Sequence, residues 1–181
     1  FSPDGSLVLF PAGLYNNANC VYVYTRKGFL NGPVACITGF EKATVGVRFN
    51  PNYYKVSEKN ERDYEEKVRT FTNLPYKFYF AVCSQDAVTI YDTLRFVPVA
   101  LIKNTHYAAL CDVCWSPCGL YLMISSIDGY CSMVKFEDGE LGMRVEKTVE
   151  KRVEKKVDEL EELVEEKEEK EEKEEKEEKM E

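Results

Sequence analysis

The residues best suited to chemistry are the single histidine of the chain and a group of cysteines that follows it. Cys111, Cys114 and Cys118 come after His106 at intervals that resemble a zinc site. However, Cys111 and Cys114 belong to a predicted strand, and residues three apart on a strand point to opposite faces. His106 also stands outside a zinc-like arrangement. We therefore expect no metal site and no cofactor, and we expect the cysteines to be small buried core residues.

The cysteine count favours reduced thiols in a cytosolic or nuclear compartment. There are 7 cysteines, an odd number, and no secretory segment precedes them. No run of 18 or more apolar residues occurs, so nothing in the sequence indicates a membrane span. The chain begins at Phe1 in the middle of a motif, and we interpret it as a fragment of a longer protein.

The composition fits one globular domain with a charged appendage. Of the 181 residues, 44% are hydrophobic and 13% are aromatic, which is enough for a core. The net charge of -8 is unevenly placed, because residues 144–181 hold 11 basic and 18 acidic side chains, net -7. Only -1 remains for residues 1–143, so the globular part is nearly neutral.

A turn of defined sequence recurs along the chain. WSPCG at 115–119 has counterparts in FSPDG at 1–5 and FNP at 49–51. Proline at the second position and glycine at the fourth suit a type I turn. Each turn is followed by a strand, a short polar turn and a second strand, and two strands precede the second and third turns. The predicted strands are residues 6–12, 20–25, 33–37, 44–49, 77–84, 87–92, 97–102, 110–115, 120–126 and 131–136.

The spacing of these turns indicates a propeller. Trp115 follows Phe49 by 66 residues, of which about 24 belong to a charged insertion at 53–75. The remaining interval of about 42 residues matches the period of four-stranded propeller blades. The predicted fold class is therefore all-β, with one half unit and two whole units.

Several residues resemble the signature of the WD40 repeat family. His106 stands nine residues before Trp115, as the histidine of the Gly-His signature precedes its aromatic residue. Two Ser-x-Asp pairs and a Tyr-Asp pair also match, although Gly39-Phe40 replaces Gly-His in the middle unit. The resemblance implies a structural hydrogen-bond network, not catalysis, for Ser84, Asp86, Tyr91, Asp92, His106, Trp115, Ser126 and Asp128.

No other pattern resembles a catalytic set. The sequence has no phosphate-binding glycine-rich loop, no nucleophile motif and no paired histidines. We therefore expect a binding module and not an enzyme.

Longer stretches resemble one group of propellers more closely. LPYKFYFAVCSQDAVTIYDT (74–93), NTHYAALCDVCWSPCGLYLMISSIDGYCS (104–132) and FEDGELG (136–142) are similar to the WD40 subunits, designated B, of chromatin assembly factor 1. The resemblance covers about residues 1–143, and its most specific elements are THY, SSxDGYCS and the closing Glu-Leu-Gly. Hira-type histone chaperones share FSPDG and FNP but lack the DGYCS stretch, so they rank second.

This resemblance implies a non-catalytic nuclear histone chaperone subunit. In that family a seven-bladed propeller helps deposit histone H3–H4 on newly replicated DNA, and about two and a half blades are present here. The implied partners are histone H3–H4, the large subunit of the complex and other histone chaperones, with DNA contacted only indirectly and no membrane. The motif for the partner chaperone Asf-one has no counterpart in the tail. A Hira-type chaperone and a WD40 scaffold outside chromatin remain the alternatives.

The tail divides into two predicted segments. Apolar residues recur at spacings of three and four within 144–164, which predicts an amphipathic helix. Residues 165–181 repeat Glu-Glu-Lys and should form a solvated helix or a disordered extension. Residues 158–181 carry five basic and fifteen acidic side chains, net -10. This block could receive basic histone surfaces, or it could only confer solubility.

Partner contacts are predicted at two further places. Tyrosines in or beside the insertion could anchor a partner, and the first glutamates of the repeat could contact histones. These candidates are Tyr53, Tyr54, Tyr64, Tyr76, Glu165 and Glu166.

Overall fold

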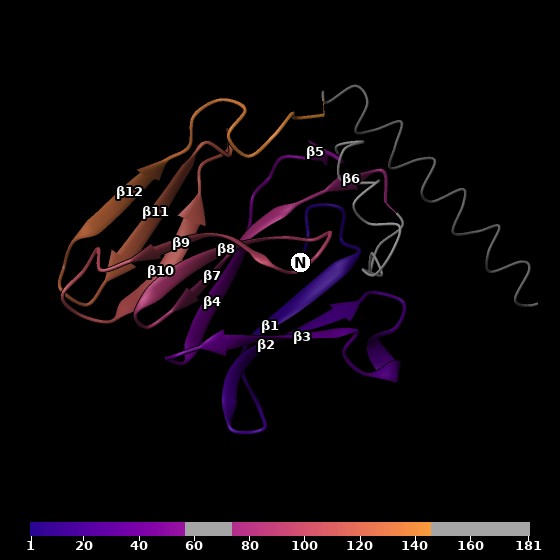
Figure 1. Cartoon of the computed structure of the whole chain (residues 1–181), viewed down its shortest axis with the longest axis horizontal. Helices are drawn as coiled ribbons and strands as arrows, with labels where there is room; N and C mark the ends of the chain where they lie inside the picture. Colours follow the sequence, from indigo (N-terminus) through magenta and orange to yellow (C-terminus); the bar gives the residue numbers. More distant parts are fainter. Residues whose placement is uncertain (57–73, 146–181) are drawn as a thin grey trace, which may run out of the picture. The chain divides into compact units, whose positions relative to one another are not determined.

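Ten strands of the described residues form three antiparallel sheets, which follow one another along the chain (Figure 1). The computed structural model describes residues 1–56 and 74–145. The all-β class is confirmed. The sheets, in spatial order, are β1 (Leu7–Tyr15), β2 (Ala18–Thr25) and β3 (Ala35–Phe40); β4 (Thr44–Phe49), β7 (Tyr79–Ser84), β8 (Ala87–Asp92) and β9 (Pro98–Lys103); and β10 (Leu110–Trp115), β11 (Tyr121–Ser126) and β12 (Cys131–Lys135).

Three smaller elements complete the described part of the chain. The 3-10 helix η1 (Phe29–Asn31) lies between β2 and β3. The short strands β5 (Tyr54–Lys55) and β6 (Tyr76–Lys77) pair with each other and close the base of the charged insertion. Arg144 forms a β-bridge with Tyr54, so this first residue of the predicted tail helix is extended instead of helical. The contacts separate Phe1–Arg144 from Val145–Glu181, and residues 146–164 of the predicted helix and the Glu-Glu-Lys segment lie outside the described residues.

The strands were predicted in nearly the right places, but their grouping was wrong. The prediction joined each of the strands at 33–37 and 97–102 to the unit that follows it. In the structure β3 pairs with β2, and β9 pairs with β8. Each therefore ends its sheet as the last strand of an antiparallel meander, and the chain then crosses to the next sheet. The described sheets thus have three, four and three strands.

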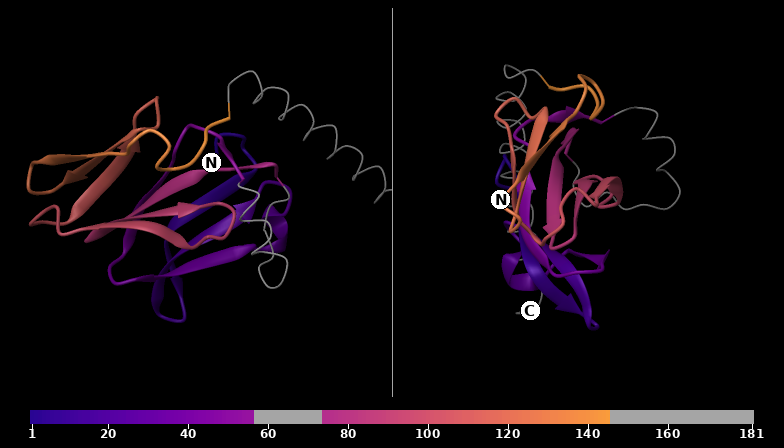
Figure 2. Two further views of the ribbon diagram at one scale, coloured as in Figure 1. Left: turned by 45° about the horizontal axis from the view of Figure 1, so that its top comes forward. Right: turned by 90° about the vertical axis from the view of Figure 1, so that its left-hand side faces the viewer.

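The central sheet supplies two cores because its strands are buried on both faces. All residues of β7 and β8 are buried. Successive residues of a strand point to opposite faces, so Ala81 and Cys83 pack toward the third sheet while Phe80 and Val82 pack toward the first. Figure 2 shows the central strands between the other two sheets in two further orientations. This packing holds the three sheets as consecutive layers of one unit.

Cys111, Cys114 and Cys118 were expected to be small buried core residues, and this prediction is wrong for all three. Cys20 and Cys83 are buried, and burial raises the pKa of the Cys83 thiol to about 12. Cys36 is half-buried. The exposed ones are Cys111, Cys114, Cys118 and Cys131. Cys114 shares a row of the third sheet with Met123 and with Met133, which is 63% exposed, so this row belongs to an open face of that sheet.

The recurrent turns have the predicted geometry. The amide of Gly5 donates to the carbonyl of Ser2 at 2.9 Å, and the amide of Gly119 donates to the carbonyl of Ser116 at 2.8 Å. Both glycines have a positive φ, +74° and +68°, which favours glycine at these positions. The third turn is also tied to the second, because the Asn50 side-chain amide donates to the Gly119 carbonyl at 2.8 Å.

Replacing Gly119 with alanine should therefore destabilise the chain. A side chain at φ +68° is strained, and its Cβ would collide with the side chains of Asn50 and Asn52. We expect Gly119→Ala to cost about 2–4 kcal/mol, from left-handed strain and the lost Asn50 hydrogen bond. Gly139 has φ +87° with open space around it, so Gly139→Ala should cost only about 1 kcal/mol. Urea unfolding measures both, and equal losses would show that the Asn50 contact is unimportant.

Candidate functional site

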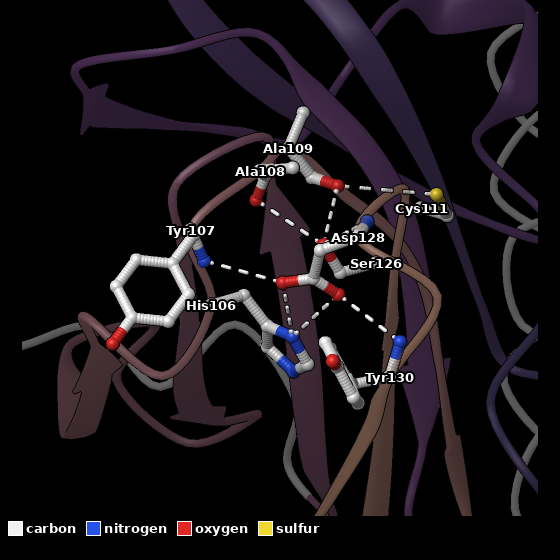
Figure 3. A network of polar contacts seen from close by, with 8 residues as sticks. All are labelled: His106, Tyr107, Ala108, Ala109, Cys111, Ser126, Asp128 and Tyr130. Atoms are coloured by element: carbon white, nitrogen blue, oxygen red, sulfur yellow. Dashed lines mark hydrogen bonds and ion pairs between the residues drawn. The ribbon is translucent and has the colours of Figure 1, made fainter.

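One carboxylate organises the loops at one end of the third sheet (Figure 3). Asp128 lies in the turn between β11 and β12, and His106 lies in the loop between β9 and β10. The Asp128 oxygens are 3.1 and 3.2 Å from His106 Nδ1. They also accept the backbone amide of Tyr107 at 3.2 Å and that of Tyr130 at 3.1 Å. The His106 side chain is 2% exposed and that of Asp128 is 11% exposed, so the contact is internal.

These hydrogen bonds determine the pKa of the Asp128 carboxyl group. Burial by itself raises that pKa, but hydrogen bonds from the Tyr130 amide, the His106 ring and the Tyr107 amide outweigh it and lower the pKa overall. A lowered pKa in the folded state stabilises the fold above the unfolded pKa of about 4, and this stabilisation is lost as the pH falls.

Asp128→Asn should therefore reduce stability in a pH-dependent way. We expect the variant to be less stable than the original chain at pH 7, and the difference to shrink as acid protonates Asp128 in the original chain. Urea unfolding at pH 7 and pH 3 measures this. The matched control is Asp138→Asn, because the Asp138 side chain is 89% exposed. A stability difference of equal size at both pH values would contradict a role for the charged carboxylate.

The other predicted members of this network have different partners. The Ser126 hydroxyl donates to the carbonyls of Ala108 and Ala109 at 3.2 and 3.0 Å, which ties the turn to the preceding loop. His106 Nε2 is buried and has no hydrogen-bond partner among the described residues. The structure thus brings together His106, Ser126 and Asp128, but the serine bonds to the backbone and not to the imidazole.

Trp115 was predicted to belong to the same structural network as His106, and it has structural contacts at another place in the sheet, where it packs against the core. It ends β10, whereas His106 precedes the start of that strand, so the strand's length of roughly 20 Å separates them. The indole N–H of Trp115 donates to the Arg48 carbonyl at 3.1 Å, and the ring packs on Phe136 with centroids 5.4 Å apart. Trp115 is half-buried, and it joins the central and third sheets.

The central sheet has a related network built with lysine. Ser84 Oγ donates to Asp86 at 2.9 Å, and Lys103 Nζ lies 3.5 Å from the same carboxylate. Lys103, the last residue of β9, thus pairs with the carboxylate of this Ser-Asp pair.

The Tyr-Asp pair at the end of β8 also has internal partners. Tyr91 stacks on Phe80 with centroids 5.5 Å apart. Asp92 accepts the amides of Leu94 and Arg95 at 3.1 and 3.0 Å, and it lies 3.4 Å from Lys77 Nζ. Every described contact of these side chains holds a turn or a sheet together.

The tyrosines beside the insertion are not surface anchors, contrary to the prediction. Tyr53, Tyr54 and Tyr76 are 5%, 1% and 3% exposed. Their rings pack on one another and on neighbours, with centroids 4.9 Å apart for Tyr53–Tyr76 and 4.9 Å for Tyr54–Tyr79. Pairing of β5 with β6 draws these rings into the interior. The remaining candidates, Tyr64, Glu165 and Glu166, lie outside the described residues.

Metal and membrane features can be assessed for residues 1–56 and 74–145. In these ranges no group of three or more His, Cys, Asp or Glu side chains could hold a metal ion. The same ranges contain no helix that is long and apolar enough to cross a membrane.

Comparison with known proteins identifies the family. The sequence model of the CAF1B/HIR1 beta-propeller domain matches residues 1–141. The chain belongs to this family. The match spans all three sheets, so the expected partial WD40 β-propeller is confirmed.

Within the CAF1B/HIR1 family the chain is similar to the B-type subunits of chromatin assembly factor 1. It is 44% identical over 149 residues to the B-type subunit of Mus musculus, which covers 79% of this chain and 26% of that protein. It is 40% identical over 152 residues to the corresponding protein of Schizosaccharomyces pombe, which covers 80% of this chain and 29% of that protein. Protein HIRA of Xenopus laevis is 27% identical over 143 residues, 78% of this chain and 13% of that protein. The chain spans about a quarter to a third of the length of the chromatin assembly factor 1 relatives.

The sequence reasoning missed exposed tyrosines on this CAF1B/HIR1 propeller. Tyr107 is fully exposed, Tyr130 is 70% exposed, and the adjacent Ile127 is 72% exposed. Tyr107 and Tyr130 belong to THY and DGYCS, two of the motifs identified as the most specific elements of the family resemblance. Their polar residues were interpreted as structural, and the aromatic residue beside each was not considered as a contact.

Proposed function

We propose that this chain is part of a non-catalytic scaffold subunit that helps deposit histone H3–H4 onto newly replicated DNA. The observation that carries the proposal is the 44% identity to a chromatin assembly factor 1 protein across the sheets. Its partners would be histone H3–H4, the large subunit of the complex and other histone chaperones. It would act in the nucleus and contact DNA only indirectly.

The geometry of the polar networks supports a scaffold. Asp128, His106 and Ser126 bond to each other or to backbone groups of the same loops. His106 Nε2 is buried, which keeps it from a substrate proton that a general base would have to reach. These groups stabilise loops, and the loops in turn present other side chains to partners.

The charge distribution supports different roles for the propeller blades and the acidic tail. Residues 1–143 are close to neutral, whereas residues 158–181 carry net -10. We propose the domain limits 1–143 for the propeller blades, 144–164 for a segment that forms an amphipathic helix beyond Val145 and the bridged Arg144, and 165–181 for the acidic repeat. The acidic repeat would attract basic histone surfaces at long range.

A replication-independent chaperone of the Hira type is the second candidate. The matched family model includes both types, and Protein HIRA of Mus musculus is 27% identical over 143 residues. The lower identity makes this candidate weaker than the chromatin assembly factor 1 type.

Affinity purification from dividing cells, followed by mass spectrometry, tests the proposal. The tagged bait is the protein that carries this chain, and a tagged Hira-type protein is the matched control. We expect the bait to recover H3–H4 and the large assembly factor subunit, and the control to recover H3–H4 without that subunit. Recovery of Hira-type partners would favour the second candidate, and recovery of no histones would reject both.

A further inference from the structure

Several turns of the chain contain an Asn or Asp side chain that can react with the amide of a following glycine. In this reaction the glycine nitrogen attacks the side-chain carbonyl carbon, and a cyclic succinimide forms with loss of ammonia from asparagine or of water from aspartate. Glycine permits the attack because it has no Cβ to hinder the approach. The four dipeptides of this kind are Asp4-Gly5, Asn31-Gly32, Asp128-Gly129 and Asp138-Gly139.

Hydrogen bonds restrain both reacting groups of the first dipeptide. The Asp4 carboxylate accepts the Ser6 hydroxyl at 2.8 Å and the Tyr76 hydroxyl at 3.0 Å. The Gly5 amide donates to the Ser2 carbonyl at 2.9 Å. The side chain of Asp4 would have to break these bonds to reach the glycine nitrogen, and each broken bond adds to the barrier.

The dipeptide at Asp128 is restrained in the same way. Its carboxylate accepts the amides of Tyr107 and Tyr130, and the Gly129 amide donates to the Ser126 carbonyl at 3.3 Å. The hydrogen bonds that lower the pKa of the Asp128 carboxyl group also keep it ionised at neutral pH. An ionised carboxylate is a poor electrophile, so the folded structure protects this dipeptide from cyclisation.

The dipeptide Asn31-Gly32 lacks these restraints. Asn31 is exposed at the end of η1, and in the described part of the chain its side chain has no hydrogen bond. Gly32 has φ +93°, and open space surrounds the position where a Cβ would lie. Asp138 is also exposed, but a carboxylate is a weaker electrophile than a carboxamide. Asn31 is therefore the most reactive of the four side chains.

We propose that Asn31 is a site of spontaneous deamidation in the folded protein. Hydroxide removes the Gly32 amide proton, the nitrogen attacks the Asn31 carboxamide carbon, and the bond to the side-chain nitrogen breaks as ammonia leaves with a proton from water. Water then opens the succinimide at either carbonyl, which gives aspartate or isoaspartate. The inference goes beyond the proposed function because the reaction needs only water and hydroxide.

The reaction would change an exposed loop between β2 and β3. Leu30 is 97% exposed and Phe29 is 48% exposed beside the reacting residue. Residues 26–34 contain two basic and no acidic side chains, so a new carboxylate lowers their net charge from +2 to +1. Isoaspartate also adds a methylene group to the backbone, and its carboxylate is a substrate for methyltransferases that use S-adenosylmethionine.

Peptide mapping by liquid chromatography and mass spectrometry, after incubation of the folded 181-residue chain, tests the proposal. We expect Asn31 to deamidate at least about tenfold faster than Asn19 and Asn52, because each of these precedes a residue with a Cβ. Their amides also donate to the carbonyls of Phe40 and Cys118. The rate at Asn31 should be higher at pH 8 than at pH 6, because hydroxide generates the nucleophile.

A variant and an unfolded sample provide the controls. Asn31→Gln should show no comparable deamidation, because glutamine cyclises more slowly to a larger ring, and circular dichroism checks that this variant is folded. Asp4 and Asp128 should stay unmodified in the folded chains. In guanidinium chloride their hydrogen bonds are lost, and isoaspartate should then form at both positions.

Two results would overturn the proposal. The first is deamidation at Asn31 that is no faster than at Asn19 and Asn52 in the folded chain. The second is isoaspartate at Asp4 and Asp128 that forms as fast in the folded chain as in guanidinium chloride, because the hydrogen bonds would then not select the reactive dipeptide.

Discussion

Phe80→Ala is expected to destabilise the chain by about 3–5 kcal/mol, the usual cost of removing a fully buried phenylalanine. The side chain is 0% exposed and lies in the core between the first and central sheets. Its ring stacks on Tyr91 at an interplanar angle of 16°, and its centroid is 5.2 Å from that of Phe49. Truncation would therefore leave a cavity where two sheets meet. Urea unfolding monitored by circular dichroism measures the loss.

Truncation of two less buried aromatic residues provides the comparison for Phe80→Ala. Tyr107 is fully exposed, so Tyr107→Ala should change stability by no more than about 0.5 kcal/mol. Trp115 is half-buried with one indole hydrogen bond, and Trp115→Ala should cost about 1–3 kcal/mol, less than a fully buried aromatic. If Phe80→Ala cost no more than Tyr107→Ala, the central sheet would not be the shared core of its neighbours.

Removal of the acidic repeat is expected to slow association with histones. A chain that ends at Leu163 loses 11 acidic and five basic side chains, net -6. The Glu-Glu-Lys repeat offers no apolar anchor, so its contribution should be long-range attraction that acts on the association rate. We expect the truncated chain to bind H3–H4 about tenfold more slowly at low salt, with a nearly unchanged dissociation rate. Stopped-flow fluorescence with labelled H3–H4 measures both rates.

Salt separates attraction from specific docking of the repeat. Charges are screened over about 8 Å at physiological ionic strength and over shorter distances at higher salt, so the difference between the two chains should vanish near about 0.5 M salt. A chain with glutamine in place of the repeat's glutamates serves as the matched control and should behave like the truncated one. Equal association rates at low salt would leave the repeat as a solubilising extension. An effect undiminished at high salt would require a specific interface.

The strands could be predicted from the sequence because each is bounded by a turn with its own chemistry. A Pro-x-Gly or Asp-Gly turn is specified by the few residues within it, so it can be recognised from the local sequence. Gly5 and Gly119 have the positive φ that those turns need. Sheet membership is a non-local property. The strands at 35–40 and 98–103 have a turn on either side, and only pairing decides which neighbour they join. The structure shows that β3 pairs with β2 and that β9 pairs with β8, but the local sequence pattern does not indicate either pairing.

Burial was harder to predict than strand position. Cys114 and Met133 belong to an apolar pattern, yet their row of the third sheet faces outward. Tyr54 and Tyr76, in or beside the charged insertion, were predicted to contact a partner. They are buried instead, because β5 pairs with β6. Whether an apolar residue is covered depends on which elements pack against it, and those elements are distant in sequence.

The candidate site was predicted in part for a similar reason. Ser126 and Asp128 belong to one turn, so their proximity follows from spacing alone. Their contacts with His106 and Tyr107 join the loop before β10 to the turn after β11, which only the sheet brings together. The same arrangement exposes Tyr107 and Tyr130, which spacing did not indicate.

Nucleosome assembly on replicating DNA tests the central claim most directly. A replication-competent cell extract is depleted of the protein that carries this chain, and nuclease digestion then measures nucleosome-protected DNA on replicated and unreplicated templates. We expect depletion to lower protection on the replicated template only, and we expect addition of the purified protein to restore it. Unchanged protection after depletion, or an equal loss on the unreplicated template, would contradict a role in replication-coupled deposition of H3–H4.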